Sequence, residues 1–413
     1  MSLDNIIGGF AHYQRLQSSN DDDPVDRLNH IYTVTLLVVF AIFVSGKQYV
    51  GNAIECFCPG AEFDQAKREY ARSFCWLKNT YRVHRNAVFP VDTAKRVEEE
   101  IAYYQWVPII LLVLAASFKL PNLLWRVSSY HSGMDLNQVA SMVISTQLMP
   151  ADKSRDTMRQ VAEYIDRWLE ANRQFNWNAV VRTKKFLSTR CCCFCSWGKS
   201  FGTYLTGLYL VTKFLFVLNS ACVFLIMHHV VGDWYIIFGY KLLPGLAGGA
   251  TTDPYEGDLV PDLPFFPKVT FCDFDIWQMG NIKIRYTLQC TLPINIFNEK
   301  IFAFLWIWFW AVCAITTVNF LTWVYKWVFN ANYVDINKFL TARGELITDY
   351  DRMMAVKFGT QYLRRDGTFV LHVVLKNSNS VVMGDLISEL WKMYKSKPLP
   401  PKAWAGQGDV MYI

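Results

Sequence analysis

Charged residues are scarce in this chain, and recognisable catalytic motifs are missing. Only 18% of its 413 residues are Asp, Glu, Lys or Arg, against about a quarter in an ordinary soluble domain. Its seven histidines are scattered, and there is no His-Glu-x-x-His motif, no P-loop and no dinucleotide fingerprint. These gaps argue against an enzyme, and we expect neither a metal ion nor any other cofactor.

A strongly basic surface is missing as well. The net charge is only +6, and no stripe of Lys and Arg with interleaved aromatic residues occurs, so we expect no nucleic-acid partner. Hydrophobic residues are abundant instead: they make up 52% of the chain, and 16% of its residues are aromatic. Because the apolar residues gather in long runs, the composition favours a multi-pass membrane protein over a large soluble core.

The clearest run extends from Ile101 to Trp125. No residue between Trp106 and Phe118 is charged. About 20 helical residues at ~1.5 Å each cross the ~30 Å of a hydrocarbon core. Aromatic residues flank the run at both ends, as they do at membrane interfaces. We expect Pro121, near the far end, to kink or end this helix.

Three further runs of this kind give four predicted spans. A mixed, acidic stretch precedes the first run, unlike a secretory signal, so we expect that run to remain as an uncleaved span. The predicted organisation is an N-terminal cytoplasmic or pore segment (1–30), a first span (31–50), a first extracellular loop (51–100), a second span (101–126), a cytoplasmic loop (127–204), a third span (205–231), a second extracellular loop (232–298), a fourth span (299–325) and a cytoplasmic C-terminal tail (326–413).

The orientation follows from the basic residues, because Lys and Arg are more frequent in the middle loop and the tail than in the second outer loop. We therefore expect both termini in the cytoplasm. Cysteines in the outer loops should then form disulfides, since the exterior is oxidising. With five cysteines there, Cys58 is left either free or as an alternative to Cys56. The five are Cys56, Cys58, Cys75, Cys272 and Cys290.

The polar segments carry weaker secondary-structure signals. Short strands are expected at Val269–Phe274 and Lys283–Thr291, and a helix at Asp156–Trp177. In the tail, Tyr362–Leu375 suggests a turn followed by a strand, and Gly384–Tyr394 a short helix. The predicted fold class is an all-α polytopic membrane protein: a four-transmembrane-helix bundle, with short β-strands in disulfide-bridged extracellular loops and a mainly helical cytoplasmic domain.

Two features need a specific explanation. Lys213 lies inside the third span, where a charge is costly, so it faces the bundle or a wet cavity, or it snorkels to the nearby cytoplasmic end, which is the interpretation we favour. A cysteine cluster beside basic residues suggests reversible palmitoylation, with plain reduced thiols as the alternative. The cluster comprises Cys191, Cys192, Cys193 and Cys195.

Several motifs resemble those of the innexins, the invertebrate gap-junction proteins, and the tail is similar to nematode members. The most specific is the signature at the start of the second span, formed by Tyr103, Tyr104, Gln105, Trp106 and Val107. Other matches are Asp26-Arg27-Leu28-Asn29, Cys75-Trp76, Phe271-Cys272-Asp273-Phe274 and Asn295-Ile296-Phe297-Asn298-Glu299-Lys300. The resemblance extends over nearly the whole chain.

This resemblance implies a gap-junction channel subunit that passes ions and small molecules between adjacent cells; the alternative is a non-junctional hemichannel that releases ions or ATP. It implies disulfides Cys56–Cys290 and Cys75–Cys272. It also implies a plasma-membrane location at gap junctions and a homo-oligomer of eight subunits. Its partners would be a docking hemichannel of the apposed cell, other innexins and membrane lipids.

The resemblance also places the N-terminal segment at the pore. Repeated in every subunit, an acidic ring there would favour cations. The acidic candidates are Asp4, Asp21, Asp22 and Asp23, and the candidates for lining the pore are Ile6, Phe10, Thr33 and Lys47. The alternative is that the acidic run only stops a preceding helix and caps the next one.

Overall fold

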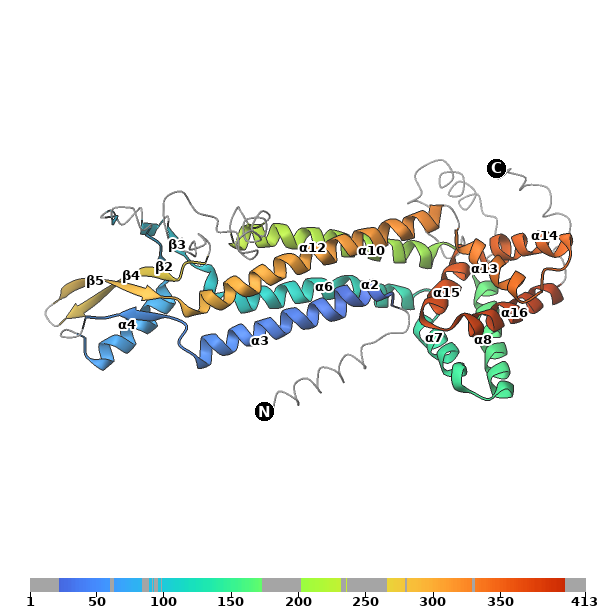
Figure 1. Cartoon of the computed structure of the whole chain (residues 1–413), viewed down its shortest axis with the longest axis horizontal. Helices are drawn as coiled ribbons and strands as arrows, with labels where there is room; N and C mark the ends of the chain where they lie inside the picture. Colours follow the sequence, from blue (N-terminus) through green and yellow to red (C-terminus); the bar gives the residue numbers. More distant parts are fainter. Residues whose placement is uncertain are drawn as a thin grey trace, which may run out of the picture. The chain divides into compact units, whose positions relative to one another are not determined.

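The computed structural model describes residues 22–59, 63–83, 89–90, 92, 96–97, 99–172, 202–231, 235, 266–278, 281–328 and 331–397. The chain forms two compact units. Unit 1 comprises residues 1–27, 121–215 and 318–413, and unit 2 comprises residues 28–120 and 216–317. Figure 1 follows the chain by colour and labels its elements.

Among the described residues, four helical stretches are long and apolar enough to cross a membrane, which confirms the four predicted spans. The first is Pro24–Val50, built from α2 (Pro24–Arg27), a π-helical turn at Leu28–Thr33 and α3 (Val34–Val50). The others are α6 (Val107–Tyr130), α10 (Tyr204–Val231) and α12 (Pro293–Val328). Pro121 does not end the second span, because α6 continues past it to Tyr130.

Aromatic and aliphatic side chains fill the space between these helices in unit 2. Leu37, Leu114 and Phe302 are fully buried in one shared cluster. Phe118 of α6 stacks on Phe309 of α12, with ring centroids 6.0 Å apart. Helix packing therefore depends on large apolar side chains in the membrane-crossing part of this unit.

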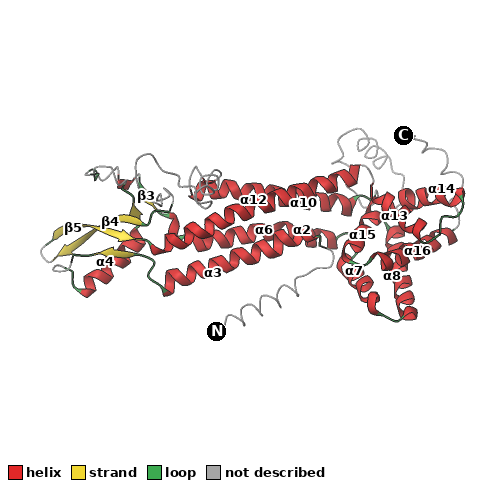
Figure 2. Cartoon of the chain, in the orientation of Figure 1, coloured by secondary structure: helices red, strands yellow, loops and turns green. Residues whose placement is uncertain are grey.

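The cap, formed by α4 and strands β1–β5, is the other part of unit 2. The strands are β1 (Glu55–Phe57), β2 (Thr80–Tyr81), β3 (Glu100–Ile101), β4 (Val269–Gln278) and β5 (Ile282–Thr291), and α4 is Gln65–Lys78. The five strands pair antiparallel in the order β1-β5-β4-β2-β3. The long strands β4 and β5 confirm and extend the two predicted strands, and Figure 2 shows α4 beside them.

The helical domain, formed by α7, α8 and α13–α16, belongs to unit 1. Its bounds are α7 Leu136–Ser145, α8 Ala151–Ala171, α13 Ala331–Ala342, α14 Asp349–Lys357, α15 Arg364–Asn377 and α16 Ser380–Ser396, with a π-helical turn at Phe358–Leu363. Trp168, Phe358, Phe369 and Trp391 meet in its core. Helix α8 confirms the helix predicted from Asp156, and α16 contains the helix predicted from Gly384.

The strand expected within Tyr362–Leu375 is wrong, because residues Arg364–Asn377 form helix α15. Every residue from Asp366 to Val374 is buried. A short, mostly apolar run such as residues 369–374 has the same pattern in a buried strand and in a helix surrounded by other helices. Only the neighbouring helices of this domain decide between the two.

Candidate functional site

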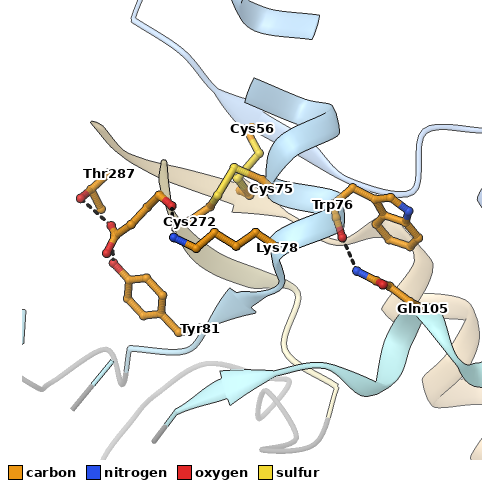
Figure 3. The surroundings of a disulfide bond; sticks show 10 residues. Cys56, Cys75, Trp76, Lys78, Tyr81, Gln105, Cys272 and Thr287 are labelled. Carbon is orange, nitrogen blue, oxygen red and sulfur yellow. Dashed lines mark hydrogen bonds between the residues drawn. A yellow bond between two sulfur atoms is a disulfide. The ribbon is translucent and has the colours of Figure 1, made fainter. Parts of the chain in front are cut away.

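Two disulfides join the predicted outer loops into one cap. Cys56 bonds to Cys290 and Cys75 to Cys272, with sequence separations of 234 and 197 residues. Cys56 and Cys290 are direct partners in the β1–β5 register, whereas Cys75 reaches the sheet from α4. These are the pairs that the resemblance implied, and Figure 3 shows the bridge between α4 and β4.

Cys58 has a free thiol that lies half-buried against the same cluster as the bridged cysteines. Burial raises the pKa of this thiol, and nearby Arg68 opposes the shift. A protonated thiol is a poor nucleophile. Cys58 does not replace Cys56 in this arrangement, because Cys56 forms the disulfide with Cys290.

A carboxylate on β4 holds the sheet to the segment before α6. Asp273 accepts hydrogen bonds from the Tyr81 hydroxyl at 3.0 Å and the Thr287 hydroxyl at 2.7 Å, which Figure 3 shows. Arg96 forms an ion pair with it at 2.6 Å. Burial tends to raise the pKa of Asp273, but the hydrogen bonds from Thr287, Arg96 and Tyr81 outweigh burial and hold it below its usual value.

The signature at Tyr103–Val107 connects three elements of unit 2. Its first residues form a 3-10 turn, in which Tyr104 is fully buried and lies 5.0 Å from Trp76, centroid to centroid. Gln105 donates its amide hydrogens to the Trp76 carbonyl and to Asn79 at the end of α4. Gln48 of α3 donates to the Tyr104 carbonyl at 2.8 Å. The motif thus fixes the ends of α3 and α4 at the start of α6.

A buried charge cluster occupies unit 1, where the first span begins; we define it as Asp23, Asp26, Lys213 and Lys376. The Lys213 ammonium lies 2.7 Å from Asp26 Oδ1 and 3.1 Å from Asp23 Oδ2, and its side chain is only 1% exposed. The snorkelling interpretation favoured from the sequence is therefore wrong. Lys213 faces the protein interior, where opposite charges compensate the cost of burying it.

Asp23 accepts three further hydrogen bonds, from helices α15 and α12. Its Oδ2 accepts from Lys376 Nζ of α15 at 2.9 Å. It also accepts from Asn319 Nδ2 and Trp323 Nε1 of α12, each at 3.1 Å. Asp23 therefore joins α10, α12 and α15 at the residue that precedes the first span. Two carboxylates and two ammonium groups leave the cluster without net formal charge.

Aromatic side chains enclose the cluster. The Tyr209 hydroxyl donates to Asp26 Oδ2 at 2.9 Å, and its ring packs against Trp323 with centroids 4.7 Å apart. Lys213 Nζ lies 5.0 Å from the centre of the Tyr209 ring, within reach of a cation–π interaction. Low-dielectric walls of this kind strengthen the ion pairs and make any unpaired charge expensive.

Two further polar contacts connect the helical domain to span ends within unit 1. Asp366 Oδ1 accepts from the Thr206 amide at 3.0 Å and the Thr206 hydroxyl at 2.9 Å, in the first turn of α10. His372 Nε2 lies 3.3 Å from Lys326 Nζ. Burial lowers the pKa of His372 to about 3, and the charges of Lys326 and Lys376 act in the same direction. The imidazole is therefore neutral at physiological pH.

Of the acidic residues proposed from the sequence for a pore ring, Asp22 and Asp23 are buried. The charge of Asp23 is neutralised within the subunit, so this residue does not contribute a free carboxylate. Asp4 and Asp21 lie outside the described residues, as do Ile6 and Phe10 and the cysteines of 191–195. No signal in the sequence pairs Asp23 with Lys213 or Lys376.

Thr33 and Lys47, proposed as pore-lining, lie in α3 and the turn before it. Thr33 is fully buried: its hydroxyl donates to the Leu28 carbonyl at 2.8 Å and accepts from Trp308 Nε1 at 3.1 Å. Within this chain α12 therefore covers Thr33, and its role in lining the pore stays a prediction. Lys47 is half-buried, with its ammonium 5.6 Å from the centre of the Phe297 ring.

Comparison with known proteins agrees with the family resemblance seen in the sequence motifs. The family model described as Innexin matches residues 22–394. Among curated proteins, Innexin unc-9 of Caenorhabditis elegans is 31% identical over 382 residues, covering 92% of this chain and 94% of the relative. Innexin-19 of Caenorhabditis briggsae is 30% identical over 410 residues, covering 92% and 88%. With its four spans and bridged cap, the chain belongs to the innexin family and is a gap-junction channel subunit.

Proposed function

We propose that eight copies of this chain close into a ring around an aqueous pore, with the cap outside the cell and both termini in the cytoplasm. Rings of apposed cells then dock and pass ions and small molecules. Other innexins are potential partners in mixed rings. The observation that carries this proposal is the pair of disulfides that joins two segments about 200 residues apart in one sheet.

The compartment of the cap follows from its chemistry. Disulfides persist in oxidising surroundings and are rare in the cytosol, so the cap belongs outside the cell. With four spans, both termini then lie on the opposite side. The richness of the middle loop and tail in Lys and Arg supports the same orientation.

A covalently bridged sheet suits a docking surface because its conformational entropy is lost before the partner arrives. Trp277 near the end of β4 and Ile282 at the start of β5 are 63% and 57% exposed. Two such side chains at the end of a rigid hairpin are suited to burial against an apposed cap. Lys283 and Arg285, which lie nearby, form ion pairs with Asp275.

The N-terminal residues complete the proposed pore. Asp23 is fixed by its hydrogen bonds, so the residues before it start from a defined point in each subunit. We retain Asp4 and Asp21 as candidates for a cation-favouring ring, and Ile6 and Phe10 as candidates for the pore wall. Neutralising Asp4 and Asp21 together would lower the cation-to-anion permeability ratio; an unchanged ratio would contradict the ring.

Expression in paired cells tests the function directly. Junctional conductance between two expressing cells, absent from pairs in which one cell lacks the protein, supports docking. Current confined to single cells would instead favour the hemichannel that releases ions or ATP. Imaging of purified particles gives the subunit number, and antibody access to a C-terminal tag only after permeabilisation supports the orientation.

Membrane lipid is a further proposed partner through Cys191, Cys192, Cys193 and Cys195. Their position among basic residues next to a span favours reversible acylation. Acyl-exchange labelling of the intact protein, lost when all four are replaced by Ala, is the expected result. Absence of labelling in the intact protein would contradict it.

A further inference from the structure

We infer that Lys376 is a positioning residue for the pore: through Asp23 it lets the helical domain hold the start of the first span and so sets the open–closed equilibrium. This inference rests on the proposed function, in which the residues before Asp23 form part of the pore. It assigns a specific side chain of the tail to the control of conduction.

Lys376 contacts Asp23 directly, and the two side chains differ in how far they are buried. Lys376 Nζ lies 2.9 Å from Asp23 Oδ2; the Lys376 side chain is 29% exposed, whereas that of Asp23 is 4% exposed. Lys376 belongs to the last turn of α15, and Asp23 immediately precedes α2. The Lys376 side chain thus reaches from the domain surface to a buried carboxylate and links α15 to the residue that precedes the first span.

The two lysines of the cluster have separable roles. Without Lys376, Asp23 still holds hydrogen bonds with Lys213, Asn319 and Trp323. No buried charge is then left without a partner, and water can enter at the exposed side. Without Lys213, by contrast, the buried Asp26 loses its ammonium partner. Lys213 therefore stabilises the fold, and Lys376 couples the domain to the span.

A second contact joins the same two segments. Arg27 Nη2 donates to Asn377 Oδ1 at 3.1 Å, four residues after Asp23 and one residue after Lys376. Lys376 also lies 5.1 Å from the centre of the Trp323 ring, which orients its side chain toward Asp23. Two adjacent contacts restrict rotation of α2 against α15 as well as separation, as a positioning role requires.

A matched control lies on the same helices. Lys326 of α12 contacts His372 of α15, so Lys326→Ala loosens packing between these helices without touching Asp23. Single-channel recording of the full chain then compares Lys376→Ala, Lys376→Arg and Lys326→Ala at equal surface amounts. Coupling between two sites is typically worth about 5-fold or more in an equilibrium. We therefore expect Lys376→Ala to shift the ratio of open to closed time about 5-fold. Lys376→Arg, which keeps the positive charge, should have the ratio of the unaltered protein, and so should Lys326→Ala.

A double-mutant cycle identifies the partner. Asp23→Asn and Lys376→Ala should shift the ratio of open to closed time by less together than the product of their separate effects, because both remove the same ion pair. Multiplicative effects would overturn the inference. So would an unchanged ratio in Lys376→Ala, an equal shift in Lys326→Ala, or failure of Lys376→Ala alone to reach the surface. Absence of any current from the unaltered chain would instead refute the proposed function.

Discussion

Asp366 of α15 caps helix α10 from a position 160 residues later in the chain, by accepting from both the amide and the hydroxyl of Thr206. The first amides of a helix have no partner within the helix, and a carboxylate there also interacts favourably with the helix dipole. The Asp366 amide in turn donates to the Gly202 carbonyl at 2.9 Å. The tail therefore completes the beginning of a predicted membrane span.

Removing this cap should destabilise the protein. Asp366→Ala is expected to lower the free energy of unfolding by about 1–2 kcal/mol, the usual cost of a lost N-cap, and Asp366→Asn by less because an amide oxygen still accepts. Thermal unfolding of purified protein in detergent measures both. Asp385→Ala, which removes an exposed ion pair with Arg343, serves as the control and should change little. Equal effects of the three substitutions would argue against the cap.

Lys213 should be essential for folding because its ammonium group compensates two buried carboxylates. Lys213→Met leaves Asp23 and Asp26 buried without their shared ammonium group, and breaking a buried pair costs about 3–5 kcal/mol. The amount of folded protein recovered from membranes should therefore fall sharply. Adding Asp26→Asn should restore part of it, since it removes a buried charge. Recovery of the Lys213→Met/Asp26→Asn double variant in no greater amount than Lys213→Met alone would contradict this explanation.

The neutral state of His372 predicts a loss of stability in acid. Its pKa in the folded protein is about 3, against 6.5 ordinarily. The unfolded chain therefore binds the proton more tightly. The contribution is fully present above pH 6.5 and is lost as the pH falls from there toward 3, by about 1–2 kcal/mol at pH 5.

The groups that face His372 all act in this titration: Lys326, Lys376 and Asp23, with both lysines opposing protonation. Melting temperatures between pH 7.5 and 5 should fall more steeply in the unaltered protein than in His372→Gln. Replacement of the exposed His131 by Gln should leave the slope unchanged. Parallel slopes in all three proteins would show that another group is responsible.

The cap should depend on its two disulfides and not on the free cysteine, Cys58. Replacing Cys56 and Cys290 by Ser removes a disulfide, which typically contributes about 2–4 kcal/mol, and should abolish coupling between paired cells. Cys58→Ser should preserve coupling, because Cys58 carries a free thiol. Peptide mapping without reduction checks the pairs. A bridge that contains Cys58 in the unaltered protein would refute this assignment.

The amide contacts of the signature motif should also be measurable. Gln48→Leu removes the donor to the Tyr104 carbonyl and leaves a buried acceptor without it, which typically costs about 1–3 kcal/mol. Gln48→Glu keeps the size of the side chain but replaces the donor with an acceptor, so it should be at least as harmful. Thermal unfolding measures both changes. The control, Gln65→Leu on the exposed surface of α4, should change the stability little.

The spans and the cap were predictable because their signals are local or chemical. Long uncharged runs identify α6 and its three counterparts whatever surrounds them. The strands around Cys272 and Cys290 follow from alternating patterns, and the motif from Tyr103 to Val107 identifies the family. Of the two outcomes expected at Pro121, a kink or an end, the end does not occur, because neighbouring helices and side chains can satisfy the backbone groups that a proline frees.

What the sequence determined on its own is the membrane class, the number of spans, the family and the expectation of disulfides in the cap; the choice between Cys56 and Cys58 came from the structure. What only the tertiary structure decided is where the charges go: Lys213 and Asp23 are 190 residues apart, and neither has a local pattern that selects the other. The same holds for α15, whose apolar run fits a strand or a helix until its neighbours surround it. Hydrophobic length and periodicity belong to a segment, whereas the cost of a buried charge depends on which distant groups come within hydrogen-bond distance of it.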